Sequence, residues 1–149
     1  MTQRNILFED NIQILSIDKD GKVFDKVSRF EARADDTECK ILLDFNSEIY
    51  PISKNSVYSI MITKSLASDG SPSPNNFSYD IYNKKTNTLL DKFDYVMNGK
   101  IFKYSEEADG KVSVYASFGG LLLGITGEPS HLNNLVMDER VYLLLKKIE

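Results

Sequence analysis

Reactive side chains are scarce in this sequence of 149 residues, which contains one histidine, His131, and one cysteine, Cys39. A catalytic cysteine or a general base needs a partner group within hydrogen-bonding reach, and a zinc site needs three or four nitrogen or sulfur ligands. His131 lies in a polar stretch, so we expect it to face solvent. Cys39 stands at the start of a strand pattern, where a small buried hydrophobe is expected. The sequence therefore predicts a protein that is not an enzyme and holds no metal or cofactor.

The charge of the chain argues against a strong nucleic-acid binder, because the formal net charge is −4 and the pI is about 5.1. Residues 18–40 contain six cations and two phenylalanines, but seven acids share that stretch. Contact with a phosphate backbone there would be weak and sensitive to salt. We keep single-strand binding as an alternative hypothesis. The residues that would carry it are Lys22, Lys26, Arg29 and Arg33.

Alternation of apolar and polar residues predicts an all-β domain, with short strands separated by turn signals. It is clearest at 40–49, where Ile41, Leu43 and Phe45 share one face with Ile49, and we expect Pro51 to end that strand. Asp18-Lys19-Asp20-Gly21 is read as a hairpin turn; as a calcium loop it would need a carboxylate where Arg29 stands. The expected strands are 8–17, 23–34, 40–49, 57–66, 93 onward, 111–117, 121–126 and 141–148, with a polar connection and one helical turn at 127–139.

Residues 67–91 interrupt this pattern with glycine, proline and asparagine, and are interpreted as one long mobile loop inside a single domain spanning 1–149. The amino-terminal ten residues lack the apolar core of a secretory signal. The longest apolar run, near 118–125, is far shorter than the roughly 20 residues that span a membrane. With a lone cysteine, these features predict a reducing, cytosolic or nuclear compartment and no membrane contact.

Gly119 and Gly120 precede three consecutive leucines, of which Leu122 must point away from the face shared by Leu121 and Leu123. The glycines lie between two strand patterns without the following helix of a phosphate-binding loop, so we expect a bulge or a close backbone approach. Both faces of the leucine strand require burial. Either another part of the chain covers the second face, or a partner does, by adding a strand to an open edge.

The amino-terminal half contains the motifs Leu7-Phe8-Glu9-Asp10, Gly21-Lys22, Phe24-Asp25, Val27-Ser28-Arg29 and Tyr50-Pro51. The carboxy-terminal half contains Asp94-Tyr95-Val96-Met97 with Gly99, then Ser117-Phe118-Gly119-Gly120-Leu121-Leu122, then Tyr142-Leu143-Leu144. Together these motifs resemble those of the small common subunit shared by eukaryotic nuclear RNA polymerases I, II and III. The resemblance covers nearly the whole chain except 67–91.

This resemblance implies an eight-stranded antiparallel barrel that is OB-fold-like. It implies a non-catalytic subunit that docks on the largest subunit of RNA polymerases I, II and III, away from the active centre, in the nucleus including the nucleolus. The residues inferred from it to face the partner are Tyr95, Gly99, Phe118, Gly119, Gly120, Leu121 and Leu122.

The chain departs from the family pattern at Asn98, where an aromatic residue is common, and at Leu123-Gly124, where Met-Arg is common. The missing arginine removes one cation from the partner contact that the resemblance implies. Asn98-Gly99 is by itself a hairpin signal. The resemblance instead implies one long bent strand with Gly99 at a bulge or kink, and we follow it.

Overall fold

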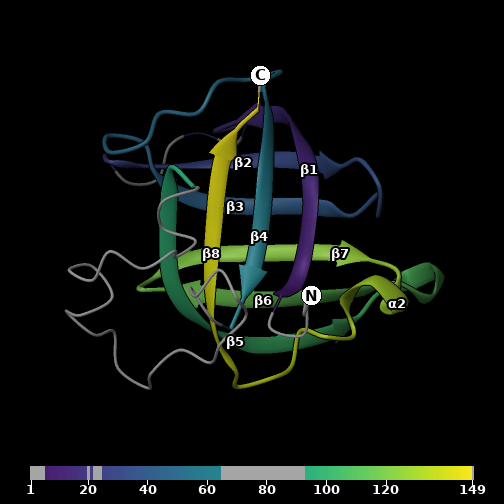
Figure 1. Cartoon of the computed structure of the whole chain (residues 1–149). Helices are drawn as coiled ribbons and strands as arrows, with labels where there is room; N and C mark the ends of the chain where they lie inside the picture. Colours follow the sequence, from purple (N-terminus) through teal and green to yellow (C-terminus); the bar gives the residue numbers. More distant parts are fainter. Residues whose placement is uncertain (1–5, 20, 22–24, 65–92, 149) are drawn as a thin grey trace.

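The computed structural model describes residues 6–19, 21, 25–64 and 93–148, and its described strands close into one antiparallel barrel (Figure 1). The order around the barrel is β1-β2-β3-β7-β6-β5-β8-β4, which confirms the eight-stranded barrel expected from the resemblance. The expected loop at 67–91 lies outside the described residues. The strands are β1 Ile6–Ile17, β2 Val27–Ala34, β3 Lys40–Asn46, β4 Val57–Thr63, β5 Tyr95–Glu106, β6 Val112–Phe118, β7 Leu121–Gly127 and β8 Arg140–Lys147; the short helices are η2 Ala108–Gly110 and α2 Pro129–Leu132.

The barrel interior follows the alternation seen in the sequence, since Ile41, Leu43 and Phe45 of β3 are at most 1% exposed. The expected end of β3 was wrong. The strand stops at Asn46, ahead of Pro51, and Ile49 is 71% exposed. Asn46 ends it because its side-chain oxygen accepts hydrogen bonds from the backbone N–H groups of Glu48, at 3.0 Å, and Ile49, at 3.1 Å.

Strand β5 is long and bent, so the local hairpin signal at Asn98-Gly99 was misleading and the continuous strand is confirmed. Its first half pairs with β8 and its second half with β6. The irregular register falls between Ile101 and Lys103, so the bulge is at Phe102 and not at Gly99. Gly99 is needed for a different reason: a Cβ there would overlap the Ser117 carbonyl oxygen and the Phe118 ring.

Strand β4 is apolar on both faces because the barrel has a second, outer cluster. Ile60 and Ile62 point into the main core, whereas Met61 packs outside with Tyr142 and Leu144 of β8. Ile6, Phe93 and Val96 pack against this outer cluster.

The turn between β2 and β3 is tied to β1 by Asp10, which is only 5% exposed. Its carboxylate accepts hydrogen bonds from Asp36 N at 3.2 Å, Thr37 N at 2.9 Å and the Thr37 hydroxyl at 2.8 Å. Next to this turn Cys39 is fully buried, and burial raises the pKa of its thiol. The expectation of a small buried cysteine is therefore confirmed.

Three tyrosines form a cluster at one end of the barrel. Tyr50 stacks on Tyr95 with ring centroids 5.1 Å apart and meets Tyr58 edge-on at 6.2 Å. The Tyr50 hydroxyl donates to Asp94 at 3.0 Å, while the Tyr95 oxygen accepts from Asn46 N at 3.0 Å. Burial is the main cause that raises the phenol pKa of all three above the ordinary value of 10.0.

These raised pKa values predict a loss of stability in alkali. The contribution of the neutral phenols is complete below the unfolded pKa of about 10. Above it the unfolded chain releases protons first, so the free energy of unfolding falls as pH rises toward the higher folded pKa values. Urea unfolding of the protein and of Tyr50→Phe, from about pH 9 to about pH 11, should show a shallower decline for the variant. Parallel declines would contradict this account.

Candidate partner interface

The glycine-leucine segment forms the hairpin that joins β6 to β7. Gly119 and Gly120 have φ angles of 64° and 97°, and a Cβ at either position would meet open space. The expected bulge or close approach was therefore wrong at these two glycines, which form a two-residue turn with positive φ. The turn exposes both glycines and places Leu121 and Leu122 directly beneath the tip, with Leu122 opposite Ser117.

The three leucines after the turn divide between the two faces of β7 as expected. Leu123 is 2% exposed inside the barrel, and Leu121 packs against the same core. Leu122 is half-buried on the outer face. The hypothesis of an open edge was wrong, because β7 pairs with both β3 and β6.

Strands β3 and β7 stop pairing beside the hairpin, and Asp44 links them there. Their register ends at Leu43 opposite Leu123. Beyond that point the Asp44 carboxylate accepts a hydrogen bond from Leu122 N at 3.1 Å. The same carboxylate holds the Arg29 guanidinium in a two-point ion pair, the longer bond being 3.1 Å. A charged pair on the outer surface thus fixes the backbone at the base of the hairpin.

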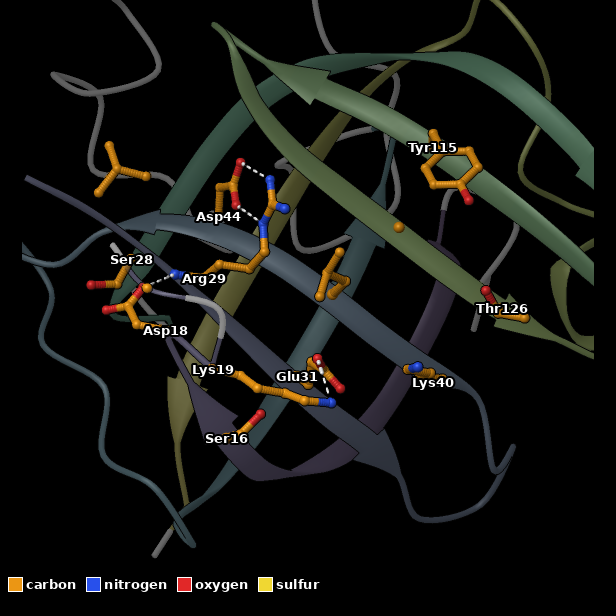
Figure 2. A pocket seen from close by; sticks show the side chains of 14 residues that line it. Ser16, Asp18, Lys19, Ser28, Arg29, Glu31, Lys40, Asp44, Tyr115 and Thr126 are labelled. Carbon is orange, nitrogen blue, oxygen red and sulfur yellow. Dashed lines mark hydrogen bonds and ion pairs between the residues drawn. The ribbon is translucent and has the colours of Figure 1, made fainter. Parts of the chain in front are cut away.

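A groove of about 430 Å³ runs from this ion pair across the outer faces of β2, β3, β7 and β6. Figure 2 shows Arg29 and Asp44 at one part of it and Tyr115 and Thr126 at another. At Gly124 a Cβ would lie 3.1 Å from the Tyr115 ring, so close approach is the right interpretation of this glycine. The groove carries acids and bases in balance, which suits a polypeptide more than a phosphate backbone.

The chain matches the RNA polymerase Rpb8 family over residues 9–147. It belongs to this family.

Relatives with similar sequences cover nearly the whole chain. It is 47% identical to the DNA-directed RNA polymerases I, II, and III subunit rpabc3 of Dictyostelium discoideum, over 96% of this chain and 98% of that one. It is 40% identical to subunit 8B of the polymerases II, IV and V of Arabidopsis thaliana, over 99% and 100%. Identity to the RPABC3 subunit of the Saccharomyces cerevisiae polymerases I, II, and III is 33%, over 96% and 99%.

The structure of this Rpb8-family chain separates the seven residues expected at the interface into two groups. Tyr95 and Phe118 are 9% and 5% exposed, and Gly99 is buried against Phe118. The side chains of Tyr95 and Phe118 therefore pack in the core of the barrel. The other four reach the surface together at the hairpin: Gly119, Gly120, Leu121 and Leu122.

Three of the four cations proposed for single-strand contact have acidic partners among the described residues. Lys26 lies 3.7 Å from Glu48 and Arg33 lies 3.4 Å from Glu38, while Arg29 is paired with Asp44. Lys22 lies outside the described residues. Because these charges are already balanced, they add little attraction for phosphate.

His131 is exposed on α2, as expected for a solvent-facing residue. Within the described ranges, no group of three or more histidine, cysteine or acidic residues could hold a metal ion. Among those same residues, no helix is long and apolar enough to cross a membrane.

Proposed function

We propose that this protein is a non-catalytic subunit shared by the nuclear RNA polymerases I, II and III, and that it docks on the largest subunit. The observation that carries the proposal is the near full-length similarity to relatives that are named as subunits of the DNA-directed RNA polymerases I, II, and III. The proposed location is the nucleus, including the nucleolus, where these enzymes work. The chemistry of transcription belongs to other chains, in keeping with the single histidine and the buried cysteine.

The proposed docking element is the hairpin Gly119–Leu122. It is supported by a half-buried leucine that points outward and by a backbone held in place through Asp44. A pre-organised loop loses little conformational freedom when a partner binds. Half-buried apolar residues beside exposed glycines allow a partner chain to approach closely.

Leu122→Asp is expected to abolish co-purification of the largest subunit while leaving the barrel folded, because the side chain points outward. Leu122→Lys should have the same effect, which separates loss of the apolar contact from repulsion by Asp44. Ile49→Asp, at a position 71% exposed and outside the hairpin, is the matched control. Tagged full-length variants would be recovered from cells and the bound largest subunit quantified.

Gly120→Val is expected to lose the partner as well, because valine at a φ of 97° distorts the turn. Undiminished co-purification with Leu122→Asp and Gly120→Val would refute the hairpin as the interface. Binding of labelled single strands that stays tight at physiological salt would favour the nucleic-acid alternative, which the paired cations disfavour.

A further inference from the structure

A second apolar surface lies where β5 bends away from β8. Phe102, Val136 and Met137 are 45%, 54% and 47% exposed. They are held close together by the backbone, since Asp138 N donates to the Ile101 carbonyl at 2.8 Å and Ile101 N donates to the Glu139 carbonyl at 3.0 Å. In Figure 1 the connection from α2 to β8 passes along β5 at this place.

Two local features maintain the exposure of these side chains. Phe102 is the extra residue of the β5 bulge, and bulges redirect side chains at sites of function. Val136 and Met137 are the first two residues of a tight turn. A 3.2 Å hydrogen bond from Glu139 N to the Val136 carbonyl closes this turn. Asp138 in that turn has a φ of 68°, a left-handed conformation that is costly for a residue other than glycine.

The same surface adjoins a hollow and an unbalanced positive charge. The hollow has a volume of about 380 Å³ and is lined in part by Ile6, Lys64 and Val136. Lys64 lies 3.5 Å from Glu139, and Lys100 lies 4.0 Å from Asp138. Arg140 is exposed, and in the described part of the chain its side chain has no ion pair. Arg140 lies three residues after Met137 in the chain and pairs with Lys100, two residues before Phe102. A cation at this place next to an apolar surface is complementary to a carboxylate flanked by apolar residues.

The register of the strands joins this surface to the hairpin. Arg140 pairs with Lys100, Lys100 with Ser117, and Ser117 with Leu122. Four neighbouring strands therefore carry one continuous row of positions from the hairpin to the free arginine. A single partner chain can reach both places, because adjacent strands are only about 4.8 Å apart.

We propose that Phe102, Val136, Met137 and Arg140 form a docking surface for an acidic, apolar segment of the partner subunit. The carboxylate of that segment pairs with Arg140, and its apolar side chains cover Phe102 and Met137. This inference rests on the proposed function, because it assumes that the partner is the subunit that also binds the hairpin.

Arg140→Glu is expected to weaken binding of the largest subunit by at least about tenfold, because two like charges then meet in the interface. Met137→Asp should weaken it to a similar degree. Lys146→Glu, an exposed charge reversal at the other end of β8, and Ile49→Asp are the matched controls. Co-purified largest subunit would be quantified at low and at physiological salt, and thermal melting would confirm that each variant is folded.

A photo-reactive amino acid at Met137 of the full-length protein, activated in the assembled polymerase, should crosslink to a largest-subunit segment with an acidic residue among apolar ones. Replacing that acid by lysine should restore binding of Arg140→Glu. A crosslink to nucleic acid, or none beyond that of the same group at Ile49, would overturn the inference.

If Leu122→Asp loses the partner and Arg140→Glu does not, the inference fails and the proposed function stands. If both variants keep it, both docking surfaces are refuted while the subunit role stands. If the unmodified protein does not recover the largest subunit, the proposed function itself fails.

Discussion

Gly99→Ala is expected to destabilise the protein by about 3 kcal/mol, at the upper end of what overpacking usually costs. The added methyl group would overlap the carbonyl oxygen of Ser117 and the ring of Phe118. The carbonyl is backbone of the neighbouring strand, so it can move only if β5 and β6 separate at this point. Urea unfolding at neutral pH should show a lower midpoint with an unchanged slope.

Gly119→Ala is the matched control, because its Cβ would meet nothing within 4 Å. Its φ of 64° is left-handed, which costs about 1 kcal/mol for alanine. In the double variant Gly99→Ala with Phe118→Leu, stability should recover only in part, since the contact with the Ser117 carbonyl remains. Equal losses for Gly99→Ala and Gly119→Ala would show that steric overlap at β5 is not what requires the glycine.

Gly99 illustrates what could be predicted about the fold from the sequence. Alternation located the strands because the barrel has one filled interior, and it failed at Ile49 because Asn46 closes a turn with its side chain. The hairpin signal at Asn98-Gly99 is local, whereas the requirement for Gly99 comes from Phe118, on another strand. The bulge at Phe102 has no signal in the sequence, because it arises where β5 exchanges one neighbour for another.

The candidate site was predicted in part. The paired glycines and Leu122 were expected at a surface, and the outward position of Leu122 followed from the period of a strand. Phe118 belongs to the same motif as the glycines, and Tyr95 belongs to another motif of the resemblance. Both are buried in the barrel, so membership of a motif did not establish exposure. The ion pair of Arg29 and Asp44 was missed. The register of the β2–β3 hairpin places these two residues directly opposite each other, and that register was the signal that could have found them.

Asp44→Ala is expected to destabilise the protein by about 2–3 kcal/mol and to weaken partner binding further. Most of the loss should come from Leu122 N, because the carboxylate is its hydrogen-bond acceptor where β3 and β7 separate. The ion pair contributes less, about 1 kcal/mol, since the Arg29 side chain is 48% exposed and screened by solvent. The hairpin should then lose its fixed position even at temperatures where the barrel stays folded.

Arg29→Ala tests whether the hydrogen bond to Leu122 N contributes more than the ion pair. This variant removes the cation and keeps the acceptor for Leu122 N. It should cost less stability than Asp44→Ala and leave partner binding nearly intact. The loss of stability caused by Asp44→Asn should lie between the losses caused by the other two variants, since its amide oxygen can still accept a hydrogen bond from Leu122 N. Urea unfolding and co-purification of the largest subunit would be measured on all three. If Arg29→Ala proved as harmful as Asp44→Ala in both, the charge pair itself, and not the bridge to the hairpin, would be what the interface requires.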